Sequence, residues 1–322
     1  MTRPSWCTVA GVVAAALALV VITTGAAAAV PDRARPGGES GLPVAGRASG
    51  GGPHLRDAVL SARSSEINPA VLGSTFMWAQ NSRRHPRHFD TFLKVSGSSR
   101  QRLNIAGTES FSGGIFGDDL VFQVKRKSRS DLRMFDLASE QFVPTPAGVN
   151  TERWEWAPTI SADHLLFGRI GRTSRVILFD RSSGAQIQLA ESSRFLRSGQ
   201  VAGNYAVYER CGARSCDVYR YDIAAETRTV IPRPSNVRWQ YTPAVDPDGT
   251  VYFFRSATGC GNNVRLLAQP LIGPAVPLLQ LPDGREAFDA YVDASGSDPV
   301  VYFDRVNCRT DNFDIHSLVV QP

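Results

Sequence analysis

A short apolar run that ends in an aromatic residue recurs through most of this 322-residue chain and constrains its fold more than any other feature. The run occurs six times, at intervals of 41 to 50 residues. The six copies are Phe76-Met77-Trp78, Leu120-Val121-Phe122, Leu165-Leu166-Phe167, Ala206-Val207-Tyr208, Val251-Tyr252-Phe253 and Val301-Tyr302-Phe303. An apolar residue precedes each copy, and further strand-like runs with turn signals follow it. Four short strands in a repeat of this length are typical of one blade, so the sequence predicts an all-β fold, a six-bladed β-propeller.

The composition agrees with this fold class. The chain is 43% hydrophobic and 20% charged, which excludes a disordered protein. Its 28 glycines and 20 prolines favour many turns and argue against a helical bundle. A β-sandwich of unrelated strands is the other all-β possibility, but it does not predict a common period.

The last repeat lacks one strand, because the chain ends at Pro322 after the third strand of that unit. The spacing between a fourth strand and the next aromatic run, counted back from Trp78, reaches Ala58-Val59-Leu60. We therefore expect this N-terminal segment to complete the last blade and remove its exposed edge.

One copy of the repeat carries a family resemblance. Residues 245–255 read Val-Asp-Pro-Asp-Gly-Thr-Val-Tyr-Phe-Phe-Arg. This segment resembles the repeat of the TolB-like six-bladed propellers, and the likeness extends by period over residues 57–322. The full Pro-Asp-Gly turn occurs in this copy alone. The resemblance implies the propeller fold and a binding role, and it supplies no catalytic residue.

The N-terminus reads as an export signal followed by a linker. Residues 1–29 contain one charged residue, Arg3, then an apolar run from Val9 to about Val21 and a series of alanines. This pattern predicts a signal peptide cleaved near Ala29, although an uncleaved membrane anchor is the alternative. Residues 30–56 are rich in Gly, Pro and Arg and predict a flexible linker, which leaves 57–322 for the propeller. We therefore expect a secreted protein or one of the extracytoplasmic cell envelope.

The cysteines indicate disulfides. Four remain after the predicted cleavage, and an even number in an exported chain is typical of disulfide bonds. We expect Cys211 to pair with Cys216 across one hairpin, and Cys260 with Cys308 between neighbouring blades. The Cys-x4-Cys spacing without a nearby histidine is a poor zinc ligand set. The chain also lacks nucleotide-binding motifs, so no metal or other cofactor is predicted.

The charge is concentrated in the segments expected between the second and third strands. These segments are 80–88, 124–131, 169–175, 209–217, 254–264 and 304–313, and together they hold 15 Lys and Arg against 5 Asp and Glu. We expect Arg169, Arg210, Arg255 and Arg305, which recur at one position of the repeat, to pair with acids of the third strands.

The leading hypothesis is a non-catalytic propeller that binds an anionic envelope polymer or an acidic protein through this basic loop face. The nearest acids in sequence are Asp90 and Asp131, so most of the basic side chains should face solvent. The candidate binding cations are Arg83, Arg84, Arg87, Lys125, Arg126, Lys127 and Arg129.

The alternative is an exported polysaccharide-acting enzyme, a hydrolase or lyase, at the mouth of the channel. The aligned first strands predict a ring of large residues that includes Trp156, Arg197 and Tyr241. Trp154 and Trp239 could add sugar-binding surface. A carboxylate pair among the acids that precede these strands could perform acid-base chemistry, but no catalytic motif accompanies it.

Two positions after the ring of large residues, the aligned first strands predict a ring of small residues: Pro69, Gly113, Pro158, Gly199, Pro243 and Ala290.

Overall fold

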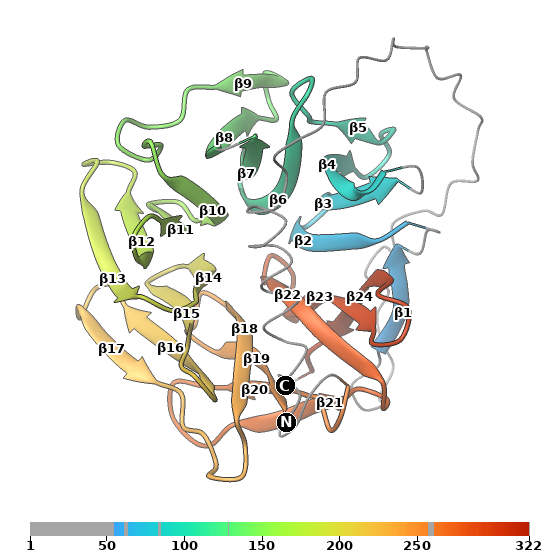
Figure 1. The fold of residues 1–322 in the computed structure, drawn as a ribbon, viewed down its shortest axis with the longest axis vertical. Coiled ribbons are helices and arrows are strands. Elements are labelled where there is room, and N and C mark those ends of the chain that lie inside the picture. The colour runs from blue at the N-terminus through green and yellow to red at the C-terminus, as the bar shows by residue number, and fades with distance from the viewer. Residues whose placement is uncertain (1–54, 61–63, 83–84, 128, 257–260, 322) are drawn as a thin grey trace. The chain divides into compact units, whose positions relative to one another are not determined.

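The computed structural model of the chain consists of β-strands, 24 of them in the part that it describes (Figure 1). The structure describes residues 55–321 except 61–63, 83–84, 128 and 257–260. For residues 55–60 it describes the backbone only. The predicted signal peptide and nearly all of the predicted linker lie outside the described residues. No helix in this part of the chain has the length and apolar content needed to cross a membrane.

The strands form two four-stranded and two eight-stranded sheets. Each eight-stranded sheet consists of two antiparallel groups of four that one parallel pair joins, Ser130 with Trp154 and Cys216 with Trp239. We call the six antiparallel groups of four blades 1 to 6. Blade 1 contains β2 (Glu66–Leu72), β3 (Thr75–Ser82), β4 (His85–Val95) and β5 (Gln101–Arg102). Blade 2 contains β6 (Glu109–Phe116), β7 (Asp119–Arg126), β8 (Arg129–Asp136) and β9 (Gln141–Val143). Blade 3 contains β10 (Trp154–Ile160), β11 (His164–Ile170), β12 (Ser174–Asp180) and β13 (Gln186–Ser192).

The second half of the chain repeats this order. Blade 4 contains β14 (Leu196–Ala202), β15 (Tyr205–Cys211), β16 (Cys216–Asp222) and β17 (Thr227–Val230). Blade 5 contains β18 (Trp239–Val245), β19 (Val251–Ser256), β20 (Arg265–Gln269) and β21 (Val276–Gln280). Blade 6 contains β22 (Arg285–Asp293), β23 (Val300–Asn307) and β24 (Phe313–Val319), together with β1 (Leu55–Leu60). The all-β propeller prediction is therefore confirmed.

The two ends of the described chain meet in blade 6. β1 pairs antiparallel with β24, with Leu55 opposite Leu318 and Leu60 opposite Ile315. Figure 1 shows the blue N-terminal strand beside the red C-terminal strands. This pairing confirms that an N-terminal strand completes the last blade, and the strand begins three residues before the predicted Ala58.

The blades stand around a ring, within the compact unit formed by residues 50–322. The first strand of each blade contacts the first strands of the two neighbouring blades. The second strand of each blade carries the repeated aromatic residue, and all six aromatics are at most 2% exposed: Trp78, Phe122, Phe167, Tyr208, Phe253 and Phe303. The aromatic run therefore recurs because it fills the core of every blade.

Each first strand carries a bulge at the same position against the second strand. Four residues at the bulge have left-handed backbone conformations: Asn68, Ala157, Thr242 and Asp289. The next position is the ring of small residues. A Cβ added to Gly199 would lie 2.2 Å from the carbonyl oxygen of Pro243, and one added to Gly113 would lie 2.7 Å from that of Pro158, each in the first strand of the next blade. Small residues occur here because the first strands approach one another closely.

The closure of the ring can be tested by truncation. We expect deletion of residues 30–54 to leave the melting temperature nearly unchanged, because β1 remains. Deletion of residues 30–63 removes β1 and exposes the edge of β24, whose Ile315 and Leu318 are fully buried, so the protein should fail to fold or melt at a much lower temperature. Thermal unfolding followed by circular dichroism measures both variants. Equal melting temperatures would contradict closure by β1.

Candidate functional site

The turns between the second and third strands of every blade lie on one side of the ring, because successive antiparallel strands reverse direction. The connections from each fourth strand to the next blade reach the same side. We call this side the hairpin face. Among the described residues it comprises the turn residues 127, 171–173, 212–215, 261–264 and 308–312, the adjoining strand ends, and the connections 103–108, 144–153, 193–195, 231–238 and 281–284.

The strands extend further into the hairpin face than the sequence analysis expected. β4 begins at His85, so Arg87 lies in a strand and not in a loop. In blade 2, Arg126 is paired directly with Arg129, which leaves a turn of two residues. The expected loops 80–88 and 124–131 are therefore mostly strand. Residues 85–88 are all exposed, so this segment lacks the alternation of hydrophobic and polar residues that would indicate a strand.

Two of the predicted binding cations are already paired. Lys125 lies 2.8 Å from Glu109 of β6, and Arg129 lies 2.7 Å from Asp131. Glu109 is 16 residues from Lys125, so nearness in sequence does not reveal this partner. Arg87, Arg126 and Lys127 are exposed, and no ion pair among the described residues involves them. Arg83 and Arg84 lie outside the described residues.

The recurring arginines do not share one type of partner. Arg169 pairs with Glu155 of the first strand of its blade, at 2.9 Å, and not with an acid of the third strand. Arg255 donates to the backbone carbonyl of Pro232. Arg210 lies opposite Asp217 across the hairpin, but Asp217 is paired with Arg233 at 2.7 Å.

The predicted aromatic platform at the channel mouth does not form as a set of exposed rings. Tyr241 is buried and donates a hydrogen bond to Glu286. Trp156 is half-buried and packs against Phe195 of the next blade, with 5.5 Å between the ring centroids. Trp154 and Trp239 are also half-buried. These side chains contribute mainly to packing between blades.

The centre of the ring is nearly filled. The ring of small residues lines a cavity of about 50 Å³. Arg197 of blade 4 forms an ion pair with Asp289 of blade 6. Gln200 exchanges two hydrogen bonds of 2.8 Å with the backbone of Val292, again between blades 4 and 6. These contacts close the channel against a ligand of ordinary size.

Buried polar side chains next to the aromatic runs support the bulges. Glu209 accepts a 2.7 Å hydrogen bond from the backbone N–H of Thr242 in the following blade. Gln123 accepts a 3.4 Å hydrogen bond from the backbone N–H of Ala157 in the same way. Asp304 holds this position in blade 6 and lies close to the backbone N–H of Asn68. Glu209 therefore has a structural role, because it accepts a hydrogen bond from a backbone donor that the bulge leaves without a strand partner. The carboxylate oxygens of Asp304 are buried without a hydrogen-bond partner among the described residues.

Burial dominates the proton affinity of three carboxyl groups. Burial raises the pKa of Asp304 to about 7, although the charge of Arg197 opposes the shift. Burial raises the pKa of Glu286 to about 7, against hydrogen bonds from Tyr241 and from the backbone of Gly261 and Ala287. The pKa of Glu66 is raised to about 8 by burial and by the nearby charge of Asp314. In each case desolvation disfavours the charged carboxylate.

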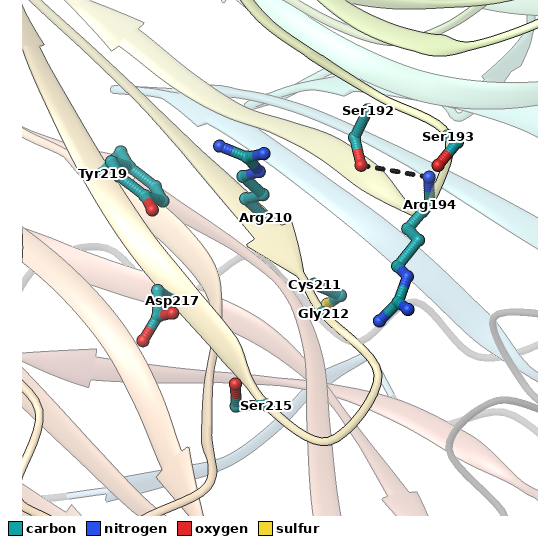
Figure 2. Close-up of a pocket in the computed structure, with 9 residues that line it drawn as sticks. All are labelled: Ser192, Ser193, Arg194, Arg210, Cys211, Gly212, Ser215, Asp217 and Tyr219. Atoms are coloured by element: carbon teal, nitrogen blue, oxygen red, sulfur yellow. Dashed lines mark hydrogen bonds between the residues drawn. The ribbon is translucent and has the colours of Figure 1, made fainter.

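A hollow of about 370 Å³ opens on the hairpin face where blades 3 and 4 meet (Figure 2). The connection after β13 forms one wall, with Arg194, and the hairpin between β15 and β16 forms the other, with Arg210. The remaining lining residues are Ser192, Ser193, Cys211, Gly212, Ser215, Asp217 and Tyr219. Neither arginine is predicted as a binding residue from the sequence. Arg194 lies outside the predicted loop segments, and the position of Arg210 in the repeat predicts pairing within the blade.

One of the two predicted disulfides is present among the described residues. Cys211 and Cys216 are bonded across the β15–β16 hairpin, as predicted. Cys308 is also disulfide-bonded, whereas Cys260 lies outside the described residues, so the bond between these two stays a prediction. Glu209 lies beside Cys211 and Cys216, but both sulfurs are held in the disulfide and cannot serve as thiolate metal ligands.

Comparison with solved structures identifies the fold. TolB from Acinetobacter baumannii matches with a TM-score of 0.52 and 12% identity, over 78% of this chain and 64% of that one. A putative TolB from Agrobacterium tumefaciens matches with a TM-score of 0.54 and 11% identity, over 81% and 92% of the two chains. An oligogalacturonate lyase from Vibrio parahaemolyticus matches with a TM-score of 0.52 and 12% identity, over 82% and 84%.

At these identities the likeness establishes the propeller fold alone, because one fold supports both binding proteins and enzymes. No protein-family model matches the sequence. No curated protein matches it either. The chain thus has the fold of TolB-type β-propellers, and its chemistry has to be argued from its own residues.

The raised carboxyl pKa values predict a pH dependence of stability. In the unfolded chain these groups have pKa values of about 4, so between about pH 4 and pH 8 the native state binds more protons than the unfolded state. The free energy of unfolding should therefore fall as the pH rises through this window. We expect the melting temperature at pH 5 to exceed that at pH 8.5 by several degrees in a calorimetric scan.

The variant Asp304→Asn should reduce this difference, because the amide stays neutral at both pH values. Asp248→Asn removes a carboxylate from an exposed turn and serves as the matched control. An unchanged pH dependence in Asp304→Asn would contradict the raised pKa.

The disulfide pairing can be checked directly. We expect peptide mapping without reduction to recover Cys211 linked to Cys216 and Cys260 linked to Cys308. Free thiols at these positions after purification from an oxidising compartment, or zinc retained by the protein, would be inconsistent with this assignment.

Proposed function

We propose that this protein is a non-catalytic, extracytoplasmic β-propeller that binds an anionic envelope polymer or an acidic protein through its hairpin face. The observation that carries the proposal is a surplus of cations on this face. Its acids are largely consumed by ion pairs, in which Glu109, Asp131, Glu155 and Asp217 each hold one basic side chain. The pairing leaves other basic side chains in solvent.

The surplus cations are exposed and take part in no ion pair among the described residues: Arg87, Arg126, Lys127, Arg194, Arg210 and Arg214. The exposed acids of the same face are fewer: Glu152, Asp283 and Asp311. Charges on neighbouring hairpins act together on an approaching polyanion when they lie within about one or two Debye lengths, roughly 8–20 Å. A cationic surface of this kind favours polyanions over neutral partners.

The proposal of a binding role without catalysis is supported by the groups at the channel. Glu286 is engaged with Tyr241, Asp289 with Arg197, and Glu155 with Arg169. A general acid or base needs to reach a substrate, and these carboxylates face partners inside the protein. An exported polysaccharide-acting enzyme, the alternative, would have to use carboxylates that already face these partners and aromatic rings that are buried or half-buried.

The extracytoplasmic location is part of the same proposal. It rests on the predicted signal peptide and agrees with the Cys211–Cys216 disulfide, because disulfides persist in oxidising compartments.

Chromatography on immobilised heparin tests the proposed face. We expect the wild-type protein to bind at low salt, and the triple variant Arg87→Gln, Arg126→Gln and Lys127→Gln to elute at clearly lower salt. These residues are exposed, so the variant should keep its melting temperature. A charge-conserving control, with Arg87→Lys, Arg126→Lys and Lys127→Arg, should elute close to the wild type. Passage of the wild type through the column, or equal elution of the glutamine variant, would refute the proposal.

A further inference from the structure

The hollow at the junction of blades 3 and 4 has the properties of a built binding site. Its volume of about 370 Å³ lies within the range of ligand pockets, about 300–1,000 Å³. It lies on the hairpin face and shares no lining residue with the cavity at the centre of the ring. Its two walls come from different blades, so a ligand here would contact both.

The charge of this pocket favours an anion. Arg194 and Arg210 are exposed, and neither forms an ion pair among the described residues. Asp217 is the acid of the lining, and Arg233 neutralises it at 2.7 Å. The pocket therefore presents two unpaired guanidinium groups, which bind carboxylate, sulfate and phosphate groups through paired N–H donors.

The walls are held in place before any ligand binds. The Cys211–Cys216 disulfide closes the hairpin, and the backbone N–H of Gly212 donates to Ser215 at 2.7 Å. The backbone N–H of Cys211 donates to the carbonyl of Phe195 at 3.1 Å, which joins the hairpin to the segment that carries Arg194. A preformed site loses little conformational entropy on binding.

The rest of the lining selects a polyhydroxylated ligand. Ser192, Ser193, Ser215 and Tyr219 are hydroxyl-bearing residues of the lining, and the Tyr219 ring is fixed by stacking on Tyr208 at 5.2 Å. The Ser192 hydroxyl accepts a 3.0 Å hydrogen bond from the backbone N–H of Arg194. The pocket has no large aliphatic side chain in its lining that would hold an apolar peptide residue. Serine hydroxyls and arginine donors suit sugar hydroxyls together with acidic groups.

The two guanidinium groups point in different directions (Figure 2). They are therefore suited to two acidic groups on successive units of one chain and not to a single shared group. We propose that this pocket binds a short acidic segment of an anionic polysaccharide, with one acidic group at Arg194 and the next at Arg210. This inference rests on the proposed function and assigns its polymer class and its principal contact.

The test uses short oligosaccharides, because they are too small to reach the cations of blades 1 and 2. Isothermal titration of the full-length mature protein should detect binding of a charged trisaccharide, either carboxylated oligomannuronate or a sulfated oligosaccharide, and much weaker binding of neutral cellotriose. Preference between the two charged probes identifies the acidic group. Arg194→Gln and Arg210→Gln should each weaken binding by about tenfold, the cost of one charged hydrogen-bonded contact.

Arg172→Gln is the matched control, because it removes the same charge from the exposed hairpin turn of the neighbouring blade 3 but lies outside the pocket lining. It should leave the affinity for the trisaccharide nearly unchanged. Equal binding of neutral and charged trisaccharides, no binding of either charged probe, or equal losses in all three variants would overturn the pocket assignment. The heparin experiment on Arg87, Arg126 and Lys127 tests polyanion binding by the rest of the hairpin face separately. Either proposal can therefore fail while the other stands.

Discussion

The pairing of β1 with β24 is the contact on which the rest of this structure depends. In blade 6 the outer strand comes from the other end of the chain, so β1 covers the edge of β24 that the C-terminal strands leave open. Closure holds each first strand between the first strands of two neighbouring blades. The antiparallel order within each blade then puts the hairpins on one side of the ring, so the charges of the hairpin face come from segments far apart in the sequence.

The centre of the ring shows how buried acids can serve structure without serving catalysis. The first strands bulge where they approach one another closely. Backbone N–H groups at the bulges have no strand partner and donate hydrogen bonds to Glu209 and Gln123. The cost is desolvation, which raises the pKa of Asp304 and Glu286 to about 7. These buried acids therefore belong to the framework of the ring, whereas the arginines of the hairpin face are accessible to a ligand.

The sequence was sufficient to predict the repeat, the closing strand and the Cys211–Cys216 disulfide. The repeat is visible in the sequence because every blade buries one aromatic residue, such as Trp78 or Tyr208, at the same position. It could not predict where the strands end, since His85 to His88 are exposed and carry no hydrophobic pattern. Nor could it predict which cations are free. Lys125 is paired with an acid of another strand, and Arg194 and Arg210 meet only through the packing of two blades. Charge pairing and pockets depend on tertiary neighbours, which no local pattern contains.

The central claim is that the free cations of the hairpin face bind polyanions. The most direct measurement is a titration of ¹⁵N-labelled protein with an acidic oligosaccharide, followed by chemical-shift changes of assigned backbone amides. The account predicts the largest changes at Arg194, Gly212 and Ser215, with smaller changes at Lys127 and none at Gly203 or Gly249 on the opposite turns. Changes confined to those opposite turns, or no changes at saturating oligosaccharide, would contradict it.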